Sequence, residues 1–149
     1  MSSLLERARE TLKIEIAGLE GLIERLGAEF EEAVKLLYAC QGKVILAGMG
    51  KSGLIAQKIA ATLTSTGTPA LFLHAGESTH GDLGIITKQD VVIAFSYSGE
   101  TNEVLQMIGH IQAIGVPLIA MTGKPDSTLA QAATVHLSIA VEKEACPLG

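Results

Sequence analysis

The sequence predicts a doubly wound α/β fold, a three-layer sandwich in which helices cover both faces of a five-stranded parallel sheet. From residue 43 onward, short and continuously apolar runs alternate with helical segments. Such runs are typical of parallel strands that are covered on both faces. The residues after these runs are rich in Gly, Ser, Thr and His, as expected of ligand-binding loops at the carboxyl ends of parallel strands.

Residues 1–40 are expected to form a helical arm in front of the sheet. Apolar side chains recur there at intervals of three and four, which places them on one face of a helix. They are Leu5, Ala8, Leu12, Ile16, Leu19, Ile23 and Leu26. A second helical stretch, residues 30–37, follows Gly27. Two alternatives stay open, because such an arm either binds a partner or folds back on its own sheet.

Residues 41–149 are expected to form one domain around the sheet. The predicted strands cover residues 43–48, 70–74, 90–96, 117–123 and 135–140. The predicted helices cover residues 52–65, 101–115 and 126–133, with a short one near 79–86. No internal repeat interrupts this alternation, so one sheet accounts for all of it.

The composition excludes several classes of function. Hydrophobic residues make up 48% of the 149 residues and charged residues 18%, which excludes a disordered chain. Aromatic residues are only 3% and the formal net charge is −5, so we expect no nucleic-acid partner. No run approaches the ~20 apolar residues that span a bilayer, and the N-terminus lacks a signal-peptide pattern. Cys40 and Cys146 show no metal-ligand spacing, so we expect reduced thiols in a cytoplasmic protein without a membrane partner.

The stretch GMGKSG (48–53) contains two phosphate-loop patterns at once. Its Gly-Lys-Ser looks like the end of a nucleoside-triphosphate loop, but Ile45 stands where that loop needs its first glycine. Its three glycines spell the dinucleotide pattern, but the next strand ends in His74 rather than in an acidic residue. Both motifs share a Gly-rich turn that leads into a helix N-terminus and binds an anion. Lys51 adds a mobile positive charge.

The stretch SYSGET (96–101) brings three hydroxyl groups to another predicted helix start. A single N-cap explains one of Ser96, Ser98 and Thr101 but not all three. Alternate hydroxyls, together with the N–H groups of a first helical turn, can surround the oxygens of one phosphate. Two such loops at neighbouring strand ends predict a site for a phosphomonoester.

GMGKSG, HAGESTHGDLG and SYSGET, in this order, resemble the sugar isomerase (SIS) domain, which has a flavodoxin-like sheet. STGTP, HGDLG, SGETNE and EKEACPLG further resemble the D-arabinose 5-phosphate isomerase family, from about residue 10 to the end. This resemblance implies the interconversion of D-ribulose 5-phosphate and D-arabinose 5-phosphate, a step in carbohydrate metabolism toward the lipopolysaccharide sugar Kdo. It also implies a homo-oligomer, either a dimer or a tetramer, and no metal or organic cofactor.

The resemblance assigns roles to eleven residues. The phosphate cradle would comprise Ser52, Ser96, Ser98 and Thr101. Further substrate contacts would come from Gly67, Thr68 and His74. The catalytic residues would be Lys51, Glu103, Glu144 and His80. The chemistry needs such groups, because an aldose–ketose isomerase moves a carbon-bound proton and stabilises an enediolate. Glu103 or Glu144 would be the base, His80 a proton shuttle and Lys51 the stabilising charge.

Simpler explanations exist for some of these residues. The helix dipole favours an acid at Glu103 in any case, and Glu144 lies in a charged run. His74 and His80, with Glu77 between them, allow at most an adventitious metal site. The main alternative function is a non-catalytic SIS sensor of sugar phosphates, and a third is a related phosphosugar isomerase. The family's later helix, with its histidine, and its CBS modules do not appear in this sequence, so we expect the piece alone to be weakly active or inactive.

Overall fold

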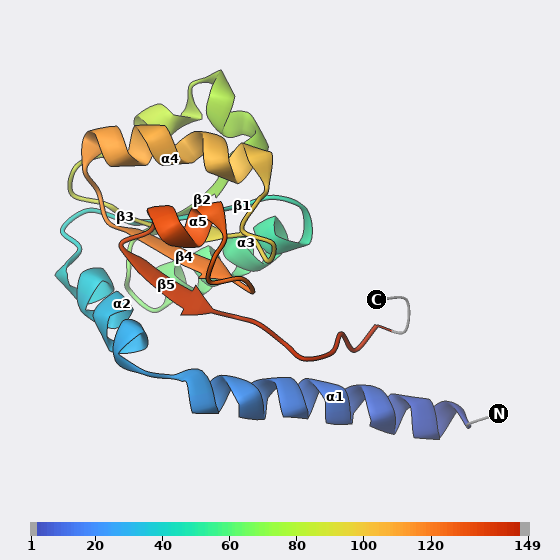
Figure 1. Ribbon diagram of the computed structural model, residues 1–149. Helices are drawn as coiled ribbons and strands as arrows, with labels where there is room; N and C mark the ends of the chain where they lie inside the picture. Colours follow the sequence, from blue (N-terminus) through green and yellow to red (C-terminus); the bar gives the residue numbers. More distant parts are fainter. Residues whose placement is uncertain (1–2, 147–149) are drawn as a thin grey trace.

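The computed structural model describes residues 3–146, apart from the side chains of Thr79 and His80. The five parallel strands are β1 (Val44–Gly48), β2 (Ala70–His74), β3 (Val91–Phe95), β4 (Leu118–Thr122) and β5 (Val135–Ser138). The helices are α1 (Leu4–Arg25), α2 (Ala28–Ala39), α3 (Gly50–Ser65), α4 (Asn102–Ile114) and α5 (Thr128–Ala132), with two short 3₁₀ helices, η1 (Ala75–His80) and η2 (Asp82–Ile85). The predicted α/β fold with a five-stranded parallel sheet is confirmed (Figure 1).

The strand order is β2-β1-β3-β4-β5. The chain therefore proceeds from β1 to one edge of the sheet and then crosses back to β3 on the other side of β1. Gly48, at the end of β1, lies opposite both His74 and Phe95. The loops after β1, β2 and β3 thus begin at one level, at the switch point where doubly wound sheets bind their ligands.

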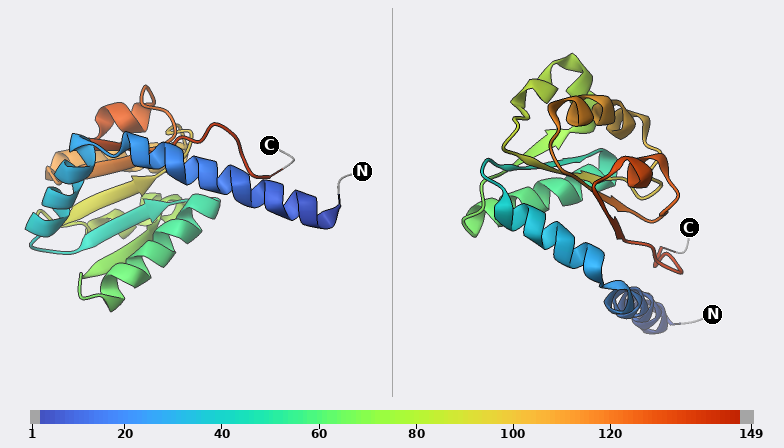
Figure 2. Two further views of the ribbon diagram at one scale, coloured as in Figure 1. Left: turned by 90° about the horizontal axis from the view of Figure 1, so that it is seen from below. Right: turned by 60° about the vertical axis from the view of Figure 1, so that its left-hand side comes forward.

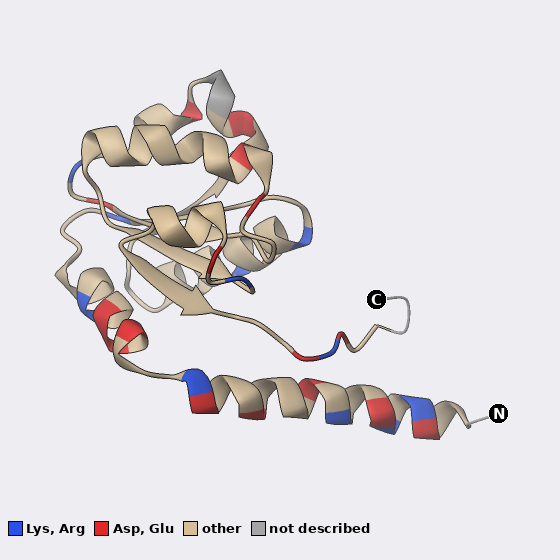
Figure 3. Cartoon of the chain, viewed as in Figure 1, with Lys and Arg blue, Asp and Glu red and all other residues tan. Residues whose placement is uncertain are grey.

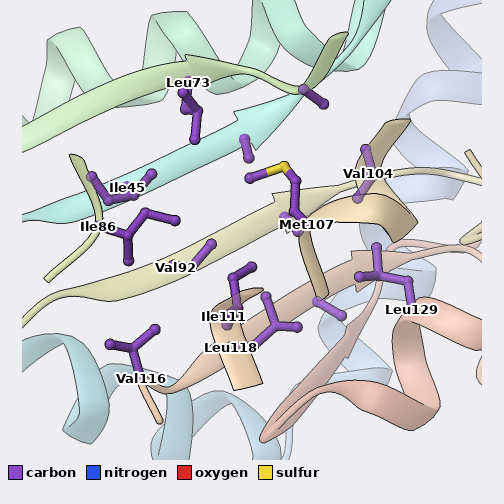
Figure 4. Packing of buried hydrophobic residues seen from close by; sticks show 14 residues of the cluster. Ile45, Leu73, Ile86, Val92, Val104, Met107, Ile111, Val116, Leu118 and Leu129 are labelled. Atoms are coloured by element: carbon purple, nitrogen blue, oxygen red, sulfur yellow. The ribbon is translucent and has the colours of Figure 1, made fainter. Parts of the chain in front are cut away.

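The core is aliphatic and lies on both faces of the sheet. On one face Ile45 and Val92 pack against Met107 and Ile111 of α4, as Figure 4 shows. The other face packs against α2 and α3, where Ala33 is only 2% exposed. Because both faces are covered, all five residues of β1 and of β3 are buried, which explains their continuously apolar sequences.

Two glycines allow α3 to start directly against β1. A Cβ atom on Gly48 would lie 3.0 Å from the backbone nitrogen of Gly53, and a Cβ on Gly53 would lie 3.1 Å from the carbonyl oxygen of Gly48. The first and third glycines of the dinucleotide-like pattern are therefore explained by close strand–helix packing.

Helix α1 projects away from the sheet (Figure 2). A capping box fixes its start, in which Ser3 and Glu6 exchange hydrogen bonds of 2.6 and 3.2 Å. None of its described residues is buried, whereas α2 packs on the sheet. Of the helical arm expected over residues 1–40, α2 therefore packs on the sheet of this chain, whereas α1 does not. No helix in residues 3–146 is long and apolar enough to cross a membrane.

Asp90 stabilises the opposite, amino-terminal edge of the sheet. Its carboxylate is buried and accepts hydrogen bonds from the backbone and ammonium of Lys43, at 2.8 and 2.9 Å, and from Thr87. Burial raises the pKa of Asp90, but the hydrogen bonds from Lys43 and Thr87 outweigh it and leave the pKa below its ordinary value. The lower folded-state pKa stabilises the fold above about pH 4, and this stabilisation disappears as the pH falls through the folded pKa.

We therefore expect Asp90→Asn to reduce the free energy of unfolding by about 2–4 kcal/mol at pH 7, because Lys43 loses its partner. The difference from the wild type should shrink as the pH falls below about 4, where the wild-type carboxyl becomes protonated. Urea denaturation at several pH values measures both effects. Asp126→Asn, at an exposed site, is the control. A difference between wild type and Asp90→Asn that does not change with pH would contradict the role of this carboxylate.

Candidate functional site

The three hydroxyl groups of SYSGET meet between the end of β3 and the start of α4. The hydroxyl oxygens of Ser96 and Thr101 are 2.8 Å apart, and those of Ser96 and Ser98 are 3.5 Å apart. Ser96 is buried and Ser98 is exposed. Thr101 is the N-cap residue of α4, but its hydroxyl does not cap the helix. Ser96 and Ser98 accept hydrogen bonds from the Gly99 and Glu100 amides, at 3.1 and 3.2 Å, within their own loop. Helix capping therefore does not explain the three hydroxyl groups of Ser96, Ser98 and Thr101, which are called the cradle from here on.

Gly99 and Glu100 dock this loop onto α5. Gly99 has a φ of 68°, and a Cβ atom there would overlap Ser127. Its carbonyl oxygen accepts a hydrogen bond from the Leu129 amide at 3.1 Å, and the Glu100 carboxylate accepts one from the Thr128 amide at 2.7 Å. Sequence reasoning did not identify these docking contacts, because they join residues 28 to 30 positions apart and no local pattern marks them.

The GMGKSG loop lies at the same edge of the sheet. Helix α3 begins at Gly50, which has a φ of 57°, and its first turn carries Lys51, which is exposed, and Ser52, which is half-buried. Since β1 and β3 are neighbours, the N-termini of α3 and α4 lie on adjacent strands. Glu103, in the first turn of α4, belongs to the same edge. Two helix N-termini, three hydroxyls and a lysine form a suitable site for a small anion.

His74 ends β2 at the level of Gly48. Its ring packs edge-on against Phe72, and its Nδ1 atom is buried without a hydrogen-bond partner among the described residues. The side chain of His80 lies outside the described part of the chain, so its position relative to His74 is not defined. No group of three or more His, Cys, Asp and Glu side chains within the described residues could hold a metal ion.

Two predicted site residues, Gly67 and Thr68, lie at the opposite edge of the sheet. Gly67 and Thr68 connect α3 to β2, at the amino ends of the strands. The length of a five-residue strand, roughly 16 Å, separates that end from the cradle. Within one chain, Gly67 and Thr68 are therefore too far away to contact a phosphate in the cradle, so the structure does not bring them together with it, and their contact with substrate stays a prediction. Glu144 lies exposed beside α1, in a groove of about 480 Å³.

The sheet order and the hydroxyl-rich loops at its switch point define a sugar isomerase domain. Residues 37–148 match the family model of the SIS domain, and the chain belongs to this family. It is 50% identical over 144 residues to the arabinose 5-phosphate isomerase KdsD of Salmonella typhi and of Escherichia coli K12. Those alignments cover 97% of this chain and 44% of each relative, so the chain spans less than half the length of these enzymes.

Two solved structures have closely similar folds. An E. coli CFT073 protein in complex with arabinose 5-phosphate is 42% identical, with a TM-score of 0.93, over 100% of this chain and 80% of that chain. A putative sugar-phosphate isomerase from Listeria monocytogenes is 31% identical, also with a TM-score of 0.93, over 99% of this chain and 79% of that chain. The recognised resemblance to the arabinose 5-phosphate isomerase family is confirmed.

We expect Ser98→Ala to weaken the binding of D-arabinose 5-phosphate roughly tenfold, since a hydrogen bond to a charged group contributes about 1.5–3 kcal/mol. The binding of free D-arabinose should hardly change, because it has no phosphate for the cradle. Isothermal titration with both sugars measures the difference. Ser65→Ala is the control, because Ser65 is the last residue of α3 and lies away from the N-terminus of that helix. Equal losses for both sugars would contradict the phosphate assignment.

Proposed function

We propose that this chain is the catalytic core of an aldose–ketose isomerase that interconverts D-ribulose 5-phosphate and D-arabinose 5-phosphate. The cradle at the switch point carries this proposal, because its three hydroxyl groups meet at the N-terminus of α4, an arrangement that suits a single phosphate group. The 50% identity to arabinose 5-phosphate isomerases supports the choice of sugar and the pathway toward Kdo. A cytoplasmic location is consistent with the free thiols of Cys40 and Cys146.

Each of the proposed site residues has its own role in binding or in proton transfer. Ser52 and the cradle hold the phosphate, which fixes the far end of the sugar chain. Glu103 or Glu144 removes the carbon-bound proton and returns it to the neighbouring carbon, while His80 transfers the hydroxyl proton. Lys51 stabilises the negative charge of the enediolate. This proton chemistry requires neither a metal ion nor an organic cofactor.

The test is to mix D-ribulose 5-phosphate with the protein expressed from its full reading frame and to follow the product by NMR. We expect D-arabinose 5-phosphate to form. In D₂O, carbon-bound deuterium should appear in the product, because the transferred proton exchanges with solvent on the base. Saturable binding without turnover would contradict the isomerase and favour a sugar-phosphate sensor.

We also propose that the protein is a homo-oligomer held together by α1. Its exposed apolar stripe is spaced by fours and threes, the spacing of a coiled-coil seam. The stripe comprises Leu12, Ile16, Leu19, Ile23 and Leu26, each more than half exposed. Figure 3 shows that charges of both signs occupy the rest of this helix. A second copy of the chain offers the same stripe, so pairing would cover both.

Ile16→Lys combined with Leu19→Lys is therefore expected to lower the assembly state, because two charges would enter the apolar seam. Sedimentation velocity measures the mass of the assembly. Glu10→Lys, which changes the charge on the other side of the helix, is the control and should leave the mass unchanged. An unchanged mass in the double variant would exclude α1 as the interface.

A further inference from the structure

The segment that leaves β5 is fixed by three different elements. This tail segment, residues 139–146, begins with the Ile139 amide donating to the Thr122 carbonyl oxygen of β4 at 2.9 Å. The guanidinium of Arg25 in α1 donates to the Ala140 carbonyl oxygen at 2.6 Å. The Val141 amide donates to the hydroxyl oxygen of Tyr97 at 3.3 Å. The start of the tail segment is therefore held between the projecting helix and the loop that carries the cradle.

Tyr97 itself contacts the end of β4. Its ring lies over Gly123, where a Cβ atom would be 2.8 Å from Cζ of the ring. Its carbonyl oxygen accepts a hydrogen bond from the Gly123 amide at 2.8 Å. Both the ring and the backbone of Tyr97 therefore rest on the end of β4. Its neighbours in sequence, Ser96 and Ser98, belong to the cradle, so Tyr97 links the cradle to Val141.

Helix α1 contacts the tail segment with a face that differs from its exposed apolar stripe. Besides Arg25, this face contains Gly18, where a Cβ atom would be in ordinary contact, 3.5 Å, with a methyl group of Val141. The residues Ile14, Gly18 and Arg25 line the groove in which Glu144 lies. On a helix with 100° between successive residues, Ile14, Gly18 and Arg25 share one side. Leu19 of the stripe also lines the groove, but each residue of the stripe stays more than half exposed.

We propose that Arg25 and Tyr97 are positioning residues, which hold the Ala140–Val141 peptide so that Glu144 reaches the sugar phosphate in the cradle. This proposal rests on the proposed function, since it needs Glu144 to exchange a proton with the substrate, either as the base in place of Glu103 or as a second group beside it. Glu144 is exposed and follows Val141 by only three residues, a reach of about 10 Å. The position of Val141 therefore limits the positions that the Glu144 carboxylate can reach. Fixing that position raises the fraction of time that the carboxylate spends at the reacting carbon.

The experiment uses Tyr97→Phe and Arg25→Gln in the protein expressed from its full reading frame. Tyr97→Phe removes the acceptor of the Val141 amide, and the Arg25→Gln side chain is uncharged and too short to keep the hydrogen bond to the Ala140 carbonyl oxygen. We therefore expect kcat with D-arabinose 5-phosphate to fall roughly 3- to 10-fold. KM should stay within about twofold, because the cradle is intact. Arg25→Lys, which keeps a donor, should recover part of the loss. Tyr38→Phe and Arg9→Gln, at exposed positions of α2 and α1, are the matched controls and should behave as the wild type.

A double-mutant cycle connects the loss to Glu144. In a Glu144→Gln background, Tyr97→Phe should have no further effect on kcat, because the group that it positions is gone. An additive loss, or a rise of KM in step with the fall of kcat, would overturn the proposal.

A measurement that does not depend on catalytic activity tests this proposal separately from the proposed function. Hydrogen exchange at the Val141 amide should accelerate in Tyr97→Phe, which removes the acceptor of this amide. It should also accelerate in Arg25→Gln, which frees the carbonyl oxygen of the same peptide, but not in the controls. Unchanged exchange would overturn the positioning role, whether or not the protein is an isomerase. Absence of isomerisation in the wild type, with accelerated exchange in both variants, would instead refute the proposed function and Glu144's part in it.

Discussion

Replacing Gly99 by alanine is expected to weaken the binding of D-arabinose 5-phosphate roughly tenfold or more and to destabilise the fold by about 2–4 kcal/mol. Two costs combine at this residue. Its φ of 68° lies in the left-handed region, and a Cβ atom would overlap Ser127 at the start of α5. The loop must then move away from α5, and the cradle hydroxyls of Ser96 and Ser98 move with it.

Gly109 provides a matched control within α4. A Cβ atom there would have no neighbour within 4 Å, and alanine stabilises a helix interior by about 0.5–1 kcal/mol relative to glycine. Thermal unfolding and titration calorimetry should show opposite effects of Gly99→Ala and Gly109→Ala on stability, with a loss of affinity only in the first. Normal affinity in Gly99→Ala would show that the cradle does not depend on its docking to α5.

Replacing Glu103 by glutamine is expected to lower kcat on the order of 10²- to 10⁴-fold with little change in KM, the size of effect that general-base catalysis provides. This prediction follows from the position of Glu103 relative to the cradle. Glu103 lies two residues after Thr101 of the cradle and in the first turn of α4. A phosphate held at that helix start would bring the sugar chain close to this carboxylate.

The competing explanation for Glu103 is a favourable interaction with the helix dipole alone. Glu29 tests it, because this residue also lies in the first turn of its helix, α2, but far from the cradle in the sheet's other layer. Glu29→Gln should leave kcat unchanged and cost a few tenths of a kcal/mol in stability, about what an exposed first-turn acid provides. If Glu103→Gln behaves like Glu29→Gln, and Glu144→Gln loses activity instead, then Glu144 is the base.

The strands were the most predictable part of this fold. Residues 70–74 were predicted without error, and the other strands were predicted one or two residues too long at one or both ends. Continuous apolar runs identify buried parallel strands, but their ends depend on where pairing stops. The helix predicted over residues 79–86 is two short 3₁₀ helices instead, since Gly81 between them has a φ of 111°.

Some parts of the candidate site could likewise be predicted from the sequence, and others could not. The positions of the Gly- and hydroxyl-rich loops, between β1 and α3 and between β3 and α4, were predictable, because glycines and hydroxyls next to helix starts follow local rules. Gly67 and Thr68 were assigned to the site through resemblance, and only the path of the chain shows that they lie at the opposite edge. Tyr97, Gly99 and their partners were not predicted as contacts, because no local pattern relates residues so far apart.

The sequence by itself determined the class of fold and predicted a site for an anion in its loops. Those properties depend on short-range rules, namely apolar runs, glycine turns and hydroxyls at helix starts. Only the tertiary structure decided which loops share an edge and which face of α1 meets the tail segment. It also showed that α1 projects away from the sheet, so that its apolar stripe does not pack on the sheet. The physical reason is that strand order and packing bring together residues whose separation in sequence carries no signal of their contact.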